Sequence, residues 1–113
     1  MKVIDVYSQY FAADCIYNGV PRRGALVRLT ATSDAGQIRY DAGLSFFPHA
    51  EEDDFAVSYD AAAEATLYAA PGRRSKKREE ALLEELRAHV DALAETLGGS
   101  VDWDHPLREA RLG

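Results

Sequence analysis

Cysteine, proline and long apolar runs are scarce in this sequence, and each scarcity excludes a class of protein. Cys15 is the only cysteine, so no internal disulfide can form and nothing indicates an oxidising compartment. No apolar run approaches the roughly 20 residues that a membrane-spanning helix needs, and the residues after Met1 lack the apolar region of a signal peptide. These absences predict a cytoplasmic protein that does not enter a membrane.

Positive charge is also in short supply. The chain has 13 lysines and arginines against 19 aspartates and glutamates, a formal net charge of -6. Uniform binding along nucleic acid requires a cationic surface that releases counterions, which this balance disfavours. Any anion binding is therefore expected to be local.

Recognised motifs of catalysis and metal binding are absent as well. The sequence has no Gly-rich phosphate loop, no Cys-x-x-Cys, no His-Glu-x-x-His and no Gly-x-Ser-x-Gly. We accordingly assign no catalytic residue, no metal ligand and no cofactor. This leaves a non-enzymatic function as the leading expectation.

The residues that are present predict one folded domain over residues 1–113. Of these, 47% are hydrophobic and 28% charged, which is typical of a globular chain long enough to bury its own core. The excess of arginine over lysine and the many alanines are typical of high-GC bacterial coding sequences. At Pro71-Gly72 the pattern changes from alternating and aromatic to charged and helix-forming, which favours an α+β fold.

A hairpin is the clearest feature of the first part. Residues 25–32 and 37–47 alternate between apolar and polar, and the residues between them, 33–36, include Asp34 and Gly36, which favour a tight turn. Further strands are expected at 55–59 and 65–69, while 60–64 is ambiguous. The segment 2–17 reads as one long, bulged strand or two short ones. Residues 100–113 are expected to form an edge strand or a docked tail.

A long helix is predicted over residues 75–97. Ser75 suits the N-cap and Gly98-Gly99 the C-terminal stop. The apolar side chains recur at three- and four-residue steps, so only one side of the helix is suited to burial. The fold class that follows is a two-layer α+β sandwich, with a mostly antiparallel sheet of four to five strands packed on this helix. Its apolar residues are Leu82, Leu83, Leu86, Val90, Leu93, Ala94 and Leu97.

The least ordinary feature is a basic cluster at the start of that helix. It has five cations in six residues at the helix end whose dipole is positive, where an acidic residue would be favoured. Backbone N–H groups and these side chains together could bind a phosphate, a nucleic-acid backbone or an acidic protein surface. The alternative is self-neutralisation, by Glu79 and Glu80 or by the acidic residues 51–54. The candidate anion-binding residues are Arg73, Arg74, Ser75, Lys76, Lys77 and Arg78.

Two other groups of polar residues have simpler explanations. His49 with the acidic residues 51–54 lacks the spacing of a calcium loop, and we interpret it as a solvated loop. Asp102, Asp104 and His105 could form a general acid/base group, yet Pro106 follows directly, as it does at many strand exits. Cys15 lies among apolar residues and reads as a small core side chain rather than a nucleophile.

Three functions remain open. The favoured one is a small non-enzymatic interaction or regulatory module that binds another protein or a second copy of itself as a homodimer. The second is a nucleic-acid or phosphate-binding protein that uses the basic cluster, assisted by Arg22 and Arg23. The third is a small enzyme with a site near Asp102, Asp104 and His105.

Overall fold

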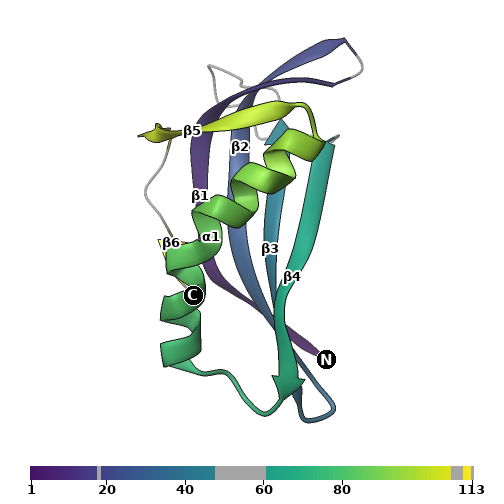
Figure 1. The fold of residues 1–113 in the computed structure, drawn as a ribbon, viewed down its shortest axis with the longest axis vertical. Coiled ribbons are helices and arrows are strands. Elements are labelled where there is room, and N and C mark those ends of the chain that lie inside the picture. Colours follow the sequence, from purple (N-terminus) through teal and green to yellow (C-terminus); the bar gives the residue numbers. More distant parts are fainter. Residues whose placement is uncertain (18, 48–60, 108–110, 113) are drawn as a thin grey trace.

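The computed structural model describes residues 1–17, 19–47, 61–107 and 111–112 of the chain. Their elements are a run of four strands, one long helix and two further strands (Figure 1). The bounds are β1 Lys2–Tyr17, β2 Val20–Asp34, β3 Gln37–Phe47, β4 Ala61–Pro71, α1 Lys76–Thr96, β5 Gly99–Pro106 and β6 Arg111–Leu112.

The strands form one antiparallel sheet in the order β4-β3-β2-β1-β5, and the short β6 pairs with β1. The predicted hairpin is confirmed as β2 and β3, and both strands run to the ends of a two-residue turn. Ala35 and Gly36 in that turn have φ values of 52° and 76°, the left-handed conformation that a tight hairpin requires.

Strand lengths resolve two open points of the sequence. The N-terminal segment is a single strand, with register shifts against β2 between Asp5 and Tyr7 and between Ala12 and Cys15. The predicted strand at 65–69 is confirmed and is longer, because β4 already begins at Ala61 within the ambiguous stretch. The strand predicted at 55–59 lies outside the described residues.

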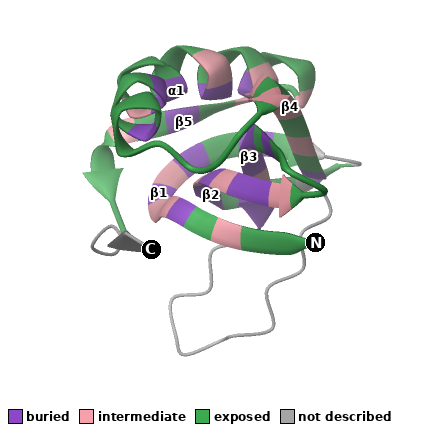
Figure 2. Ribbon diagram, turned by 90° about the horizontal axis from the view of Figure 1, so that it is seen from below, coloured by how far each residue is buried: buried purple, intermediate pink, exposed green. Residues whose placement is uncertain are grey.

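The helix confirms its predicted limits and its buried side. It crosses one face of the sheet diagonally (Figure 1). The buried residues of the two layers meet between them (Figure 2). Leu82, Leu86, Val90 and Ala94 are buried, whereas Leu83, Leu93 and Leu97 are only partly so. The two-layer α+β sandwich predicted from the sequence is therefore correct. Its fully buried larger side chains are Val27, Leu29, Tyr40, Leu44, Phe46 and Val90.

The chain then reverses into β5, the edge strand predicted for the tail. Gly98 has φ 72°, which ends the helix, and Gly99 pairs with Cys15 of β1. A side chain at Gly99 would meet the Asp14 carbonyl oxygen at 2.5 Å, so the close approach of β5 to β1 requires glycine here. None of the helical segments in the described part of the chain has both the length and the hydropathy of a membrane span.

Candidate functional site

The candidate anion site lies where α1 begins, at the end of β4. Ser75 is the N-cap, and its hydroxyl oxygen accepts a hydrogen bond from the Arg78 backbone N–H at 3.2 Å. This interaction uses one of the helix-terminal donors that an external anion would otherwise bind. Of the six candidate residues, Ser75 therefore has a capping role in the fold.

Arg74 also has a structural partner. Its Nε and Nη2 donate to the two carboxylate oxygens of Glu79, at 2.8 and 2.9 Å. The Tyr40 hydroxyl donates to Glu79 at 2.7 Å and accepts from the Ser75 backbone N–H at 3.2 Å. Tyr40 is 0% exposed and Glu79 8%, so this network connects the first turn of the helix to the buried face of β3.

This network shifts the pKa values of the Glu79 carboxyl and the Tyr40 hydroxyl. The hydrogen bonds from Arg74 are the main reason that the pKa of the Glu79 carboxyl lies below its ordinary value, with a further contribution from Tyr40 that together outweigh the effect of burial. Burial raises the pKa of the Tyr40 hydroxyl, and its hydrogen bond to Glu79 adds to the rise. Glu79 is thus held as a carboxylate and Tyr40 as a neutral donor.

The rest of the basic cluster divides in two. The Arg78 guanidinium lies 4.2 Å from the centroid of the Tyr68 ring, a cation–π contact that holds it against β4. Arg73, Lys76 and Lys77 are exposed, and no ion pair or hydrogen bond joins their side chains to the described part of the chain. Self-neutralisation therefore accounts for Arg74, through Glu79, and leaves three cations toward solvent.

The acidic residues 51–54 lie outside the described residues, so their proposed pairing with the cluster stays a prediction. The described residues that flank this stretch, Phe47 and Ala61, lie at the opposite end of the sheet from the cluster. Phe46 pairs with Ala61, whereas Gln37 pairs with Pro71 just before the cluster. Ten residue steps of β4 separate the two ends, about 33 Å.

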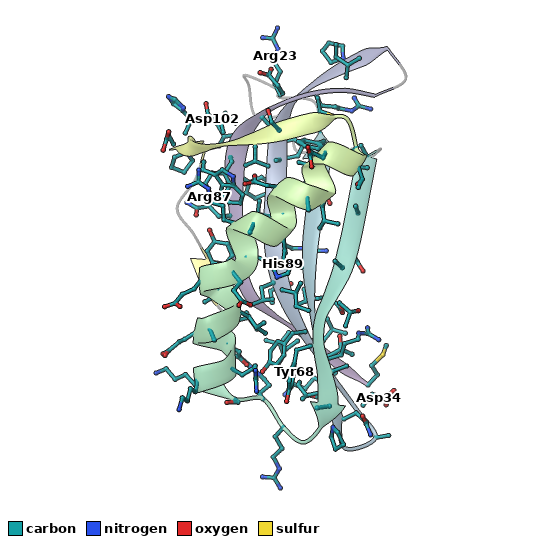
Figure 3. The ribbon with its side chains drawn as sticks, viewed as in Figure 1. Arg23, Asp34, Tyr68, Arg87, His89 and Asp102 are labelled. Carbon is teal, nitrogen blue, oxygen red and sulfur yellow. The ribbon has the colours of Figure 1, made fainter. Side chains whose placement is uncertain are left out.

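Arg22 and Arg23 do not join the basic cluster either. They lie on β2 beside Cys15, at the far end of the sheet (Figure 3). Arg22 is 4% exposed and Arg23 is exposed. A single ligand of ordinary size therefore cannot contact both groups of cations.

The acid/base group suggested for β5 is assembled in part. His105 Nδ1 lies 2.7 Å from Asp102 Oδ2, and the Asp104 N–H donates to Asp102 Oδ1 at 3.2 Å. The His105 and Asp102 side chains are 70% and 47% exposed, on the outer edge of the sheet. A pair in bulk solvent lacks the enclosed cleft in which general acid/base catalysis is effective.

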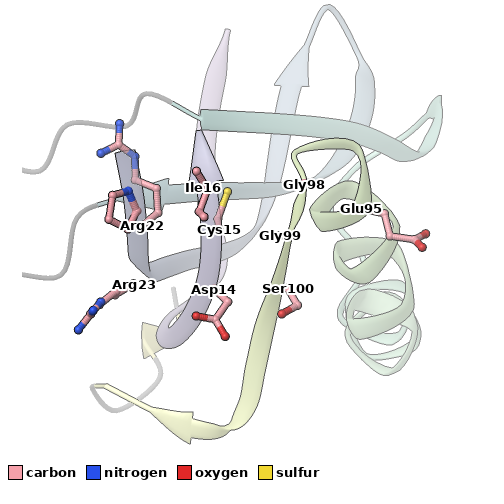
Figure 4. Close-up of a pocket in the computed structure, with 10 residues that line it drawn as sticks. Asp14, Cys15, Ile16, Arg22, Arg23, Glu95, Gly98, Gly99 and Ser100 are labelled. Carbon is pink, nitrogen blue, oxygen red and sulfur yellow. The ribbon is translucent and has the colours of Figure 1, made fainter. Parts of the chain in front are cut away.

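A shallow pocket of about 680 Å³ lies at the end of the β1–β2 hairpin, but its charged side chains do not converge. In Figure 4 Arg22 and Arg23 point to one side of the pocket and Glu95 to the other. Cys15 is buried in its wall and its thiol donates to the Leu97 carbonyl at 3.4 Å. Burial raises the pKa of this thiol, which opposes a role as a nucleophile.

Metal binding has no support in the described ranges, since no three or more His, Cys, Asp or Glu side chains gather there. The residues 49 and 51–54 fall outside those ranges.

One surface was not identified in the sequence. β4 pairs with β3 along one side, and no described strand pairs with its other side, so β4 forms one rim of the sheet (Figure 1). A single charged residue, Glu64, lies along its 11 residues. The many alanines are the sequence signal, but small residues are also common in helices and do not by themselves indicate an edge.

Comparison of the chain with protein-family models, with curated proteins and with solved structures gives no match. The functional argument therefore rests on the residues and their geometry.

Proposed function

We propose that this chain is a small non-enzymatic interaction module that binds a protein strand along the outer edge of β4. The observation that carries the proposal is that no described strand pairs with the outer edge of β4. A strand edge presents a row of backbone N–H and C=O groups to which another extended chain can pair. A cytoplasmic location belongs to the same proposal, supported by the lone Cys15 that can form no internal disulfide.

The opposite rim of the sheet is poorly suited to such binding. β5 carries Asp102, Asp104 and His105, and its pairing with β1 is interrupted, since Ala12 pairs with Asp102 but Phe11 with Pro106. Charges and irregularities of this kind are the usual means by which proteins block strand addition. β4 has one charge, so it is better suited than β5 to the addition of another strand.

Selection from a phage-displayed library of linear peptides tests the proposal. The selected peptides should bind the full chain, should protect the backbone amides of β4 from hydrogen exchange, and should lose binding in Ala65→Lys. The matched control is Ser100→Lys, which places the same charge on the β5 rim. Failure to select any peptide that depends on β4, together with a strictly monomeric chain, would refute the proposal.

A second candidate function is the binding of a phosphate-rich anion by Arg73, Lys76 and Lys77. It is favoured by the absence of partners for these three side chains in the described part of the chain, beside the positive end of the helix dipole. Fluorescence anisotropy with a labelled single-stranded oligonucleotide tests it. Arg73→Glu should weaken binding, whereas Arg23→Glu, the same charge change at the far end of the sheet, should not. Equal effects of the two variants would indicate only non-specific charge.

A further inference from the structure

The apolar side of β4 is incompletely covered. Ala63, Ala65 and Leu67 lie on the face of the sheet that packs on α1, yet each is only partly buried. On the neighbouring β3 the equivalent residues, such as Ala42 and Leu44, are 0% and 1% exposed. The difference arises because β4 is the last strand of the sheet, with nothing described beyond it. A further strand beside β4 would complete this apolar layer.

The shape of β4 limits how such a strand can pair. Tyr40 pairs with Tyr68 but Asp41 with Thr66, so Leu67 is an extra residue at a bulge. The regular part of the edge therefore runs from Ala61 to Thr66, which is six residues, and Leu67 follows it at the bulge.

The residues from Ala63 to Leu67 can pair with the same residues of a second copy in the antiparallel direction. If the twofold axis relating two copies passed through Glu64, two carboxylates would lie directly opposite each other, which is destabilising. An axis at Ala65 places Ala65 opposite its own copy, and the small Ala63 opposite the larger Leu67. Glu64 of one copy then lies opposite Thr66 of the other, on the face of the sheet that does not pack on α1. Each copy offers one such edge, so pairing two copies closes the assembly and leaves no edge for a third.

We infer that β4 pairs antiparallel with β4 of a second copy, about a twofold axis at Ala65, so that the two sheets become one. This inference rests on the proposed strand-binding function and names its partner. The occupant is a copy of this chain because the same edge supplies both the small and the large apolar residues that fit each other. About this axis the pairing covers the five residues from Ala63 to Leu67, because Ala62 would fall opposite Tyr68, beyond the bulge.

Sedimentation equilibrium of the full chain is the first test. A reversible monomer–dimer equilibrium is expected, which Ala65→Lys shifts to monomer by placing two cations opposite each other at the axis. Ser100→Lys is the matched control on the β5 rim and should leave the equilibrium unchanged. Circular dichroism and thermal unfolding confirm that each variant is folded. A dimer that persists in folded Ala65→Lys would place the interface elsewhere and overturn the inference.

Disulfide crosslinking tests the register and does not depend on a disruptive variant. In a Cys15→Ser background, which keeps a donor for the Leu97 carbonyl, Ala65→Cys should form an intermolecular disulfide because directly opposed residues lie close enough. Ala69→Cys is the control on the same strand. Four residues from the axis, its two copies would be about 27 Å apart and should not crosslink. Crosslinking of the Ala69→Cys variant but not of Ala65→Cys would contradict this register.

The outcomes separate the inference from the function on which it rests. A monomeric chain that still binds selected peptides along β4 overturns the dimer and keeps the strand-binding function. A monomeric chain that binds no peptide overturns both. Inhibition of dimerisation by a peptide of residues 61–71 supports both the dimer and the strand-binding function.

Discussion

Glu79 is the residue on which the packing of the helix start depends most. It accepts two hydrogen bonds from Arg74 and one from the fully buried Tyr40. We expect Glu79→Ala to lower the free energy of unfolding by about 2–3 kcal/mol, because it removes charged hydrogen bonds at a site with little access to water. The exposed neighbour Glu80→Ala is the control and should change it by less than about 0.5 kcal/mol. Urea unfolding measures both, and equal effects would contradict the role of the network.

The same carboxylate predicts a dependence of stability on acid. The pKa of Glu79 is lowered in the folded state, so its contribution is fully present above the unfolded-state value and is lost as the pH falls through the folded-state value. The urea midpoints of the unaltered chain and Glu79→Gln should therefore differ most at neutral pH. They should begin to converge as the pH falls below about 4.5, the ordinary glutamate value, and should meet only below the lower folded-state pKa. A difference that stays constant down to low pH would mean that the charge of Glu79 is unimportant.

Among the elements, those with a regular pattern could be predicted, whereas the place of β4 at the rim of the sheet could not. The periodicity of α1 and the hairpin turn specify their own limits, because a one-sided helix and a two-residue turn are local properties of the chain. The position of β4 at the rim depends on the strand order, which no local pattern encodes. The same is true of the basic cluster: Arg74 reaches Glu79 because Tyr40, 39 residues away from Glu79, holds that carboxylate in place.

The junction of α1 and β5 offers a test at the level of elements. A side chain at Gly99 would lie 2.5 Å from the Asp14 carbonyl and 2.7 Å from Cys15 Cβ, both on the paired strand. We expect Gly99→Ala to destabilise the chain by about 1–3 kcal/mol, since β5 must move away from β1.

Gly43→Ala on β3 is the matched control for that substitution. Its new Cβ would meet only Glu64 Cγ, at 4.0 Å, which is an ordinary contact. The unfolded chain loses freedom on this change, so Gly43→Ala should be neutral or stabilise by up to about 1 kcal/mol. Thermal unfolding compares the two variants. A Gly99→Ala chain as stable as Gly43→Ala would show that the approach of β5 to β1 is not close enough to exclude a side chain.

At the scale of the whole molecule, salt should affect the two proposed interactions in opposite directions. Two copies with a formal charge of -6 each repel one another, and the β4 edge contributes only Glu64 to their contact. Salt screens that repulsion, so dimerisation should strengthen between about 50 and 200 mM salt. Binding of a single-stranded oligonucleotide by Arg73, Lys76 and Lys77 should instead weaken by roughly 20-fold, because about three released counterions give a slope near -2.

Sedimentation and anisotropy over the same salt series measure the two responses on one protein preparation. Arg73→Glu provides the control, since it should reduce the salt slope of oligonucleotide binding by about a third and leave the sign of the dimer response unchanged. A dimer that weakens as salt is added must be held by ion pairs, which the single charge of β4 cannot supply. That result would move the dimer interface from β4 to a charged surface, whereas opposite responses would assign self-association and anion binding to separate surfaces of the same molecule.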